Sequence, residues 1–335
     1  MSGSTLPYRL RPHKAVDRRL FMDLLNRYER WRDLDEHVYV SMAAFAMEDQ
    51  KLVHRTLGLQ RLLAFDMDVN VVGRQEFNRP TANTKCVEST ATAMTSDIVT
   101  NVEKAGINDA GGYIVWLDYT DPKDIGQQVA DFASLLSQLA TDDIVRVTVN
   151  ANWNWWGGPS TPYKPVPVPE RQAKAMETLK RKLVRYLPTD IKQTDLDEHG
   201  ICVALARCFG KAADEVVRGK LKFEPLSIIR YADGQQMMTI TGAITNLTDR
   251  ASLRQKIGLA HWPFASSSWA DVNFLAVPDL TARERLYLER EASRGAAALS
   301  ASLGFDFEAA AEMPGFIANF ERYYRHYPAF TAVEL

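Results

Sequence analysis

Five short, mainly apolar segments recur along residues 38–149 at a nearly constant spacing, and this rhythm constrains the fold more than any other feature. The segments are Val38–Met42, Leu62–Phe65, Lys85–Glu88, Tyr113–Leu117 and Ile144–Val149. Each interval is long enough for a loop, a helix and a second loop, which is the connection that parallel strands require. The spacing therefore predicts an α/β fold with a Rossmann-like, doubly wound, mostly parallel sheet.

Three helices and a hairpin are expected around and after these strands. Amphipathic or proline-bounded stretches predict helices over His13–Trp31, Glu170–Tyr186 and Ile201–Val217. The apolar runs Phe223–Tyr231 and Gln235–Ile244 are joined by Ala232-Asp233-Gly234, and an Asp-Gly pair between two such runs favours a tight hairpin. The sheet is thus expected to end in an antiparallel hairpin. An unrelated α/β sheet with a hairpin at its edge fits the same pattern.

The pattern becomes helical after residue 245. Thr281 and Glu284 have the spacing of a capping box, and Phe316–Tyr324 is amphipathic and rich in aromatic residues. We expect two parts: a Rossmann-like domain over residues 1–245 and a mainly helical region over residues 246–335.

The composition is that of an ordinary globular protein. Apolar residues make up 46% of the 335 residues, charged residues make up 24%, and the net charge is −2, which argues against a basic surface over the whole molecule. Three scattered cysteines are too few for a disulfide framework, and no His or Cys spacing suggests a metal site. The first residues lack the apolar run of a signal peptide and no stretch is long enough to span a bilayer, so we expect a cytoplasmic protein without membrane contact.

Acidic residues follow the second predicted strand. In a doubly wound sheet, ligands bind outside the carboxyl ends of the strands. Asp66 directly follows Leu62–Phe65 and lies 25 residues beyond Ser41, which is where a carboxylate can hold a nucleoside ribose. Asp68 is the neighbouring candidate. The alternative is that Asp66 only ends the strand or caps the next helix.

A second acidic pair follows the fourth predicted strand. Asp118 and Asp121 lie in the segment Asp118-Tyr119-Thr120-Asp121-Pro122, and either carboxylate could orient or deprotonate an acceptor group. Both could instead cap the helix that begins near Pro122.

Three tryptophans follow the fifth predicted strand. Trp153, Trp155 and Trp156 open a proline-rich loop that also contains Gly157-Gly158. Together with Tyr119 they could contact a flat substrate or anchor a protein partner. The alternative is that they pack on the C-terminal helical region.

Several of these segments resemble one protein family. VYVSMAAFAMED, LLAFDMDVNVVGRQEFNRP and IVWLDYTDP resemble the first, second and fourth motifs of class I S-adenosylmethionine-dependent methyltransferases. Arg74–Pro80 and Tyr323–Pro328 narrow the resemblance to a bacterial group often labelled "putative O-methyltransferase". The resemblance implies S-adenosylmethionine bound at Ser41, Met42, Ala43, Ala44 and Asp66, and Asp118–Pro122 beside the transferred methyl group.

The first loop departs from that family pattern. Methyltransferases of this class place glycines there, whereas this chain has none between Trp31 and Gly58, so Cβ atoms are expected to crowd the cofactor. Two hypotheses therefore stand. The chain is a methyltransferase acting on a polar small molecule, a nucleotide or a nucleic acid. Alternatively it is a degenerate subunit that senses a ligand or serves as a scaffold in a bacterial complex, for example in phage defence, with the tryptophan loop and C-terminal helices contacting a protein partner. An NAD-linked oxidoreductase fits less well, because a pyrophosphate requires the missing glycines more.

Overall fold

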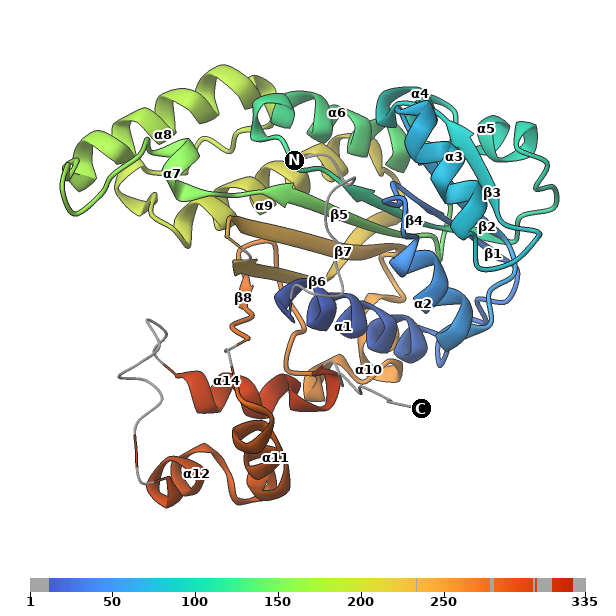
Figure 1. The fold of residues 1–335 in the computed structure, drawn as a ribbon. Coiled ribbons are helices and arrows are strands. Elements are labelled where there is room, and N and C mark those ends of the chain that lie inside the picture. Colours follow the sequence, from blue (N-terminus) through green and yellow to red (C-terminus); the bar gives the residue numbers. More distant parts are fainter. Residues whose placement is uncertain (1–11, 233, 278–279, 304, 306–314, 328–335) are drawn as a thin grey trace.

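One mixed sheet organises the molecule (Figure 1). The computed structural model describes residues 12–232, 234–277, 280–303, 305 and 315–327. Within them, eight strands follow the order β3-β2-β1-β4-β5-β7-β6-β8. The strands are β1 (His37–Ser41), β2 (Leu62–Asp66), β3 (Lys85–Glu88), β4 (Gly112–Asp118), β5 (Ile144–Asn150), β6 (Leu221–Ala232), β7 (Gln236–Asn246) and β8 (Asn273–Phe274).

The first five strands run parallel, as the spacing predicted, and each begins within one residue of its expected start. β1 pairs with β2 on one side and with β4 on the other. The strand order therefore reverses between β1 and β4, and this reversal is the topological switch point of the sheet. Every residue of β5 is buried, because helices cover both faces.

The predicted hairpin is also confirmed. β7 runs antiparallel to β5 and to β6. Asp233 of the predicted turn lies outside the described residues, and Gly234 has a φ of 76°, a left-handed conformation that glycine adopts without steric cost. β6 has a register irregularity between Pro225 and Ser227, where the proline has no N–H to donate to the neighbouring strand.

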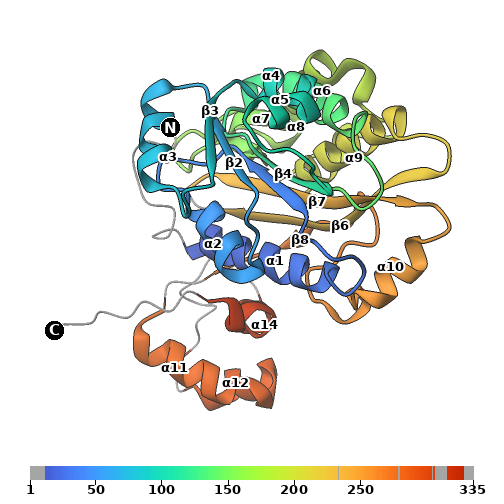
Figure 2. The same ribbon diagram turned by 90° about the vertical axis from the view of Figure 1, so that its right-hand side faces the viewer.

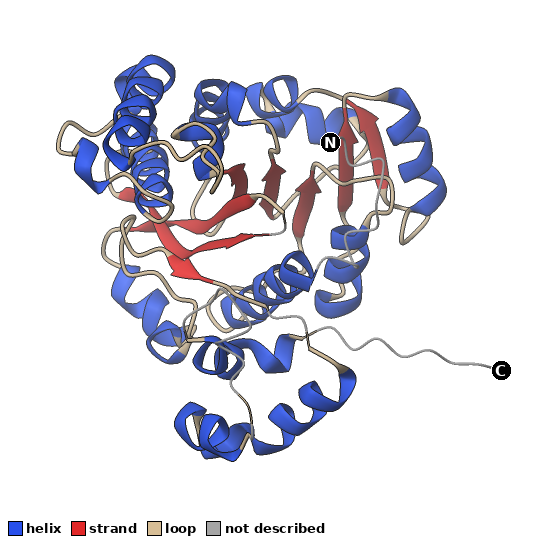
Figure 3. Ribbon diagram, turned by 60° about the vertical axis from the view of Figure 1, so that its left-hand side comes forward, coloured by secondary structure: helices blue, strands red, loops and turns tan. Residues whose placement is uncertain are grey.

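Helices form a layer on each face of the sheet (Figures 2 and 3). One layer holds α4 (Ala91–Ser96), α5 (Ile98–Lys104), α6 (Ile125–Leu136), α8 (Val168–Leu183) and α9 (Gly200–Val216), whose apolar side chains share one core with the sheet. The other holds α1 (Pro12–Tyr28), α2 (Glu48–Leu57) and α10 (Arg250–Lys256). α3 (Val69–Asn78) packs beside β2 and β3 at the end of the sheet.

A buried ion pair anchors α1 to the sheet. Arg146 of β5 approaches Asp17 of α1 at 2.5 Å, and both side chains are almost completely buried. The Arg146 guanidinium also donates to the Thr241 hydroxyl at 2.8 Å and lies 4.7 Å from the ring centroids of both Phe21 and Trp116. These contacts supply the partners that a buried charge requires.

The chain after β7 returns to the sheet before it forms the C-terminal helices. Residues 264–275 run along the outer side of β6: the Ser266 N–H donates to the Leu226 carbonyl and the Leu275 N–H donates to the Arg230 carbonyl, both at 2.9 Å. β8 lies within this segment. The division between residues 245 and 246 stays a prediction. Residues 264–275 come after that division in the sequence, yet they pack on the sheet.

Three further α-helices follow among the described residues of the C-terminal region, α11 (Ala282–Glu291), α12 (Ala296–Ser302) and α14 (Phe316–Tyr323). The predicted capping box of Thr281 and Glu284 forms at the start of α11. The Arg19 side chain of α1 donates to the Tyr327 carbonyl at 2.9 Å, which ties the end of this region to α1. Among the described helices, none combines the length and apolarity that a bilayer span needs.

Candidate active site

A cavity of about 350 Å³ opens at the carboxyl ends of the parallel strands. Its lining comes from residues at or just after the carboxyl ends of β1, β2, β3 and β4, including Met42, Asp66, Ser89, Asp118 and Thr120. The cavity therefore lies at the switch point between β1 and β4, where ligands bind in sheets of this kind. The structure brings Met42, Ala44, Asp66, Asp68 and Asp118 of the predicted site together around it.

The two acidic residues after β2 have different roles. Asp68 caps α3, because its carboxylate accepts from the Asn70 N–H at 2.8 Å. Asp66 precedes the helix and accepts from the Asp68 N–H at 2.8 Å, and its carboxyl group lines the cavity. Partial burial raises the pKa of Asp66 above its ordinary value, although the Asp68 N–H opposes the shift. Met67 between them is exposed and adds an apolar surface to the cavity.

Hydrogen bonds hold the glycine-free loop after β1 by its carbonyl groups. The four consecutive carbonyls of residues 43–46 each accept one hydrogen bond. The donors are, in that order, the Gln75 side-chain amide, the Met47 N–H (2.9 Å), the Asn78 side-chain amide (3.1 Å) and the Lys51 ammonium group (2.8 Å). Two donors come from α3, and Arg74 of the same helix stacks 3.3 Å from the Phe45 ring centroid. α3 therefore fixes the path of the loop.

The side chains of this loop alternate between the core and the cavity. Ala43 and Met47 are buried against Ala64 of β2, whereas Met42 and Ala44 line the cavity. Met47 takes the left-handed conformation that ends the loop, with a φ of 52°. The loop thus turns into α2 without a glycine, and three of its carbonyls accept from side chains of α2 and α3.

Ser41 is engaged at the end of β1. Its hydroxyl donates to the Asp49 carboxylate at 2.5 Å and accepts from the Gln50 amide at 2.9 Å. Tyr39 donates to the same Asp49 oxygen at 3.0 Å. Ser41 is 1% exposed, so its hydroxyl serves a buried polar network between β1 and α2.

Asp118 forms an ion pair with the first helix. The Lys14 ammonium group lies 2.9 Å from Oδ2 of Asp118, and Lys14 is 5% exposed. Oδ1 of Asp118 is buried, and within the described part of the chain it has no hydrogen-bond partner. Asp118 thus lines the cavity with one carboxylate oxygen paired to Lys14 and the other buried and unpaired within the described residues.

Asp121 and Tyr119, the other two predicted site residues of this segment, have structural roles. Asp121 accepts from the Lys123 N–H at 2.9 Å and caps the short turn that begins at Pro122. Tyr119 is 8% exposed, and its hydroxyl donates to Asp131 of α6 at 3.1 Å. Burial raises the pKa of Tyr119 well above its ordinary value. The Tyr119 ring therefore belongs to the core beneath α6, away from a substrate or partner.

The tryptophans form a short helix, α7 (Trp153–Trp156), which packs on α8. Trp156 is fully buried, whereas Trp153 and Trp155 are half-buried and pack against the core that contains α6 and α9. The Arg171 guanidinium of α8 lies 4.9 Å from the Trp153 ring centroid. The tryptophans do not line the cavity beside Asp66, and their core contains none of the C-terminal helices that the structure describes.

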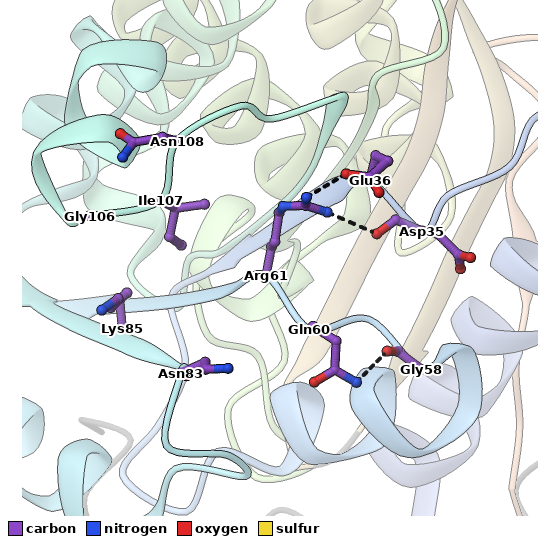
Figure 4. Close-up of a pocket in the computed structure, with 10 residues that line it drawn as sticks. All are labelled: Asp35, Glu36, Gly58, Gln60, Arg61, Asn83, Lys85, Gly106, Ile107 and Asn108. Atoms are coloured by element: carbon purple, nitrogen blue, oxygen red, sulfur yellow. Dashed lines mark hydrogen bonds and ion pairs between the residues drawn. The ribbon is translucent and has the colours of Figure 1, made fainter.

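A larger depression, of about 610 Å³, lies at the opposite edge of the sheet (Figure 4). Its lining residues lie near the amino ends of β1, β2, β3 and β4, and Arg61 in its wall is paired with Glu36. This edge lies away from the switch point, so volume alone does not identify the site.

Sequence reasoning missed Lys14, Gln75 and Asn78. Lys14 is 104 residues from its partner Asp118, and such a distance leaves no local signal. Gln75 and Asn78 are three residues apart on α3, and that spacing places two amides on one helix face. Their position in the segment Arg74–Pro80, which supported the family resemblance, was the available hint.

Several solved structures are similar to this chain at low identity. They include Trm1 from Pyrococcus horikoshii in complex with S-adenosyl-L-methionine (11% identity, 73% of this chain, 57% of that chain, TM-score 0.42). A second is the N-methyltransferase NodS from Bradyrhizobium japonicum WM9 (8% identity, 69% of this chain, 97% of that chain, TM-score 0.34). A third is an O-methyltransferase from Bacillus cereus in complex with SAH (11% identity, 67% of this chain, 79% of that chain, TM-score 0.35). This chain thus spans less than two thirds of the length of Trm1.

No curated protein matches the sequence significantly. A sequence profile does match, over residues 6–335, and it describes the family as "Putative O-methyltransferase". This match covers nearly the whole chain, so the protein belongs to that methyltransferase family.

Proposed function

We propose that this chain transfers a methyl group from S-adenosylmethionine to a polar acceptor, such as a small molecule or a nucleotide, at the cavity beside Asp66. The observation that carries the proposal is the Asp66 carboxylate at the switch point of the sheet, in a cavity of about 350 Å³. That volume lies within the range of small-molecule sites, roughly 300–1,000 Å³. When bound, S-adenosylmethionine supplies an electrophilic methyl group on a sulfonium centre.

The residues around the cavity suit the parts of such a cofactor. The Asp66 carboxylate would accept hydrogen bonds from both hydroxyl groups of a ribose. Met67 offers an apolar surface to a flat base, and the Ser89 hydroxyl offers a polar group nearby. Met42 and Ala44 would line the remainder of the ligand. Ser41, Ala43 and Asp68 would support the site from behind through the contacts described above.

The loop after β1 supports the proposal despite its lack of glycine. Three of its carbonyls accept from side chains of α2 and α3, and Ala43 is buried against the core. The N–H groups of residues 43–46 have no hydrogen-bond partner within the described part of the chain. They remain to donate to an anionic group of a ligand, such as a carboxylate.

Asp118 would orient the acceptor. Its buried and unpaired Oδ1 would accept a hydrogen bond from the acceptor group, while Lys14 holds the opposite oxygen. Methyl transfer depends strongly on such positioning. Asp121 would act more remotely, by fixing the turn that follows.

Calorimetric titration of the full chain with S-adenosylmethionine and with S-adenosylhomocysteine tests this proposal. Asp66→Asn removes the charged acceptor, and charge-assisted hydrogen bonds contribute roughly 1.5–3 kcal/mol, so we expect about a 10- to 100-fold rise in Kd. Asp68→Asn is the matched control, because asparagine caps helices as well as aspartate does, and its Kd should stay within about twofold of wild type.

Two results would count against the proposal. A wild-type chain that binds neither ligand would refute the function itself. Binding that Asp66→Asn leaves unchanged would refute the ribose assignment.

A further inference from the structure

A strongly basic segment follows β5, although the chain as a whole is slightly acidic. Residues 151–187 contain seven lysines and arginines and two glutamates, whereas the whole chain has a net charge of −2. The remaining residues are therefore net negative. This contrast concentrates positive potential on the surface formed by α7, the loop after it and α8, which we call the α7–α8 surface.

Four of these cations are not neutralised. Lys164, Lys174, Lys180 and Arg181 are exposed, and none of them forms an ion pair with another described residue. The positive charges of these four exposed side chains are therefore available to bind an anionic partner. A polyanion that binds them releases its condensed counterions, which favours association at low salt.

Aromatic rings lie among the cations. Tyr163 is 99% exposed and is adjacent to Lys164. Trp153 and Trp155 are half-buried, and each has a cation over its ring, Arg171 and Lys182 respectively. Basic groups interleaved with accessible rings are the features that bind single-stranded nucleic acid, because phosphates meet the cations and bases stack on the rings.

The α7–α8 surface also contains a hollow. A cavity of about 350 Å³ is lined by Gly157, Gly158, Lys164 and Lys174, among others. Gly158 has a φ of 86°, and a Cβ at this position would lie 2.9 Å from the Lys174 ammonium nitrogen. Glycine therefore allows the loop to approach Lys174 closely and brings two lysines into one concave site.

The surface lies next to the candidate active site. α7 and α8 lie beyond the carboxyl end of β5 (Figure 1). The Lys182 ammonium group donates to the Lys123 carbonyl, three residues after Thr120, which lines the cavity beside Asp66. Asn150, at the end of β5, donates to the Thr120 carbonyl at 3.1 Å. A strand lying on α8 can therefore reach the reaction edge.

We propose that the α7–α8 surface binds single-stranded nucleic acid and presents one of its nucleotides to the cavity beside Asp66. This inference rests on the proposed function and specifies its acceptor class. An acidic polypeptide could satisfy the cations but would not stack on the exposed Tyr163 ring, so this ring favours a nucleic acid.

The test is fluorescence anisotropy of the full chain with a 20-nucleotide, fluorescein-labelled RNA of mixed sequence, between 50 and 200 mM KCl (about the range over which phosphate contacts are sensitive to salt). The triple variant K164E/K174E/R181E removes three cations, and each phosphate contact contributes about 0.7 to the logarithmic salt slope for single strands. We expect the slope to fall by about 2 and the affinity to fall at least about 30-fold at low salt. The control R55E/K104E/K220E makes the same change in net charge at exposed positions of α2, α5 and the residue before β6, and its affinity should remain within about threefold of wild type.

Tyr163→Ala tests stacking. It should weaken RNA binding about tenfold, since a stacked base contributes roughly 1–3 kcal/mol, and leave the binding of poly-glutamate unchanged. Three results would overturn the inference: no RNA binding by the wild type, equal losses in the two triple variants, or competition by poly-glutamate as strong as by RNA of equal charge. Titration of each variant with S-adenosylhomocysteine separates the two proposals, because cofactor binding without RNA binding refutes this inference and leaves the proposed function intact.

Discussion

The Lys14 ammonium group pairs with the Asp118 carboxylate at 2.9 Å and thereby joins the first helix to the reaction edge of the sheet. The two side chains are 6% and 16% exposed, so solvent screens their attraction only weakly.

Lys14→Met should lower the free energy of unfolding by about 3 kcal/mol, because it leaves a buried carboxylate without its cation. Urea denaturation at neutral pH measures the change. Arg79→Met is the matched control, because it breaks the exposed Arg79–Glu76 pair at 3.0 Å and should cost less than about 1 kcal/mol. The double variant Lys14→Met/Asp118→Asn should lower the free energy of unfolding by less than the sum of the two single changes. Equal costs for Lys14→Met and Arg79→Met would contradict the prediction.

Asp143 should make the stability depend on pH. Burial raises the pKa of Asp143 from 3.8 to about 6, although the Ala140 and Tyr113 N–H groups oppose the shift. Because the folded pKa exceeds the unfolded one, the stabilisation is complete below about pH 4 and is lost as the pH rises through about 6. The free energy of unfolding of wild type relative to Asp143→Asn should fall by about 3 kcal/mol between pH 4 and 7. Parallel pH profiles for the two proteins would show that Asp143 does not titrate in this range.

Gln75 should determine the order of the loop after β1. Gln75→Glu keeps the shape of the side chain but removes the donor to the Ala43 carbonyl, and a buried group left unsatisfied costs about 1–3 kcal/mol. We expect faster hydrogen exchange at the Met47 N–H, which is bonded to the Ala44 carbonyl within the loop, and about tenfold weaker binding of S-adenosylhomocysteine.

Gln60→Glu is the control for this loop. The Gln60 amide also donates to a backbone carbonyl, that of Gly58, at 2.9 Å, but at the exposed opposite edge of the sheet. Unchanged exchange of the Met47 N–H in Gln75→Glu would rule out the role of Gln75.

Trp156→Ala should destabilise the fold by about 3–5 kcal/mol, because the side chain is fully buried and its removal leaves a cavity. Tyr163→Ala should change the stability by less than about 0.5 kcal/mol, because the ring is exposed. Urea denaturation of both variants checks the contrast. Similar midpoints would mean that Trp156 is not part of the core.

The strand pattern was predictable because each parallel strand is buried on both faces and leaves an apolar run at a regular interval. β8 was not, because two residues, Asn273 and Phe274, carry no periodicity and depend on the exposed edge of β6. The same limit applied to the tryptophans. Composition cannot distinguish the buried Trp156 from a ring that meets solvent, since α8 decides which rings are covered.

The candidate site was predictable only where the topology alone positions a residue. Asp66 and Asp118 end β2 and β4, the two parallel strands on either side of β1, so both had to lie at one edge. The partner of Asp118 comes from α1, and its identity depends on how that helix docks through Asp17 and Arg146. The glycine-free loop was expected to be crowded by Cβ atoms. Its path depends instead on α3, which no local pattern of residues 42–47 reveals.

The segment of residues 264–275 also has a consequence for how chains meet one another. β6 is the longest strand, with 12 residues, and its outer side would otherwise present a row of unpaired N–H and carbonyl groups. Such a row is a template for strand pairing between molecules. By occupying the Leu226 and Arg230 carbonyls with its own N–H groups, the folded chain leaves fewer groups on this edge free to pair with a strand of another molecule.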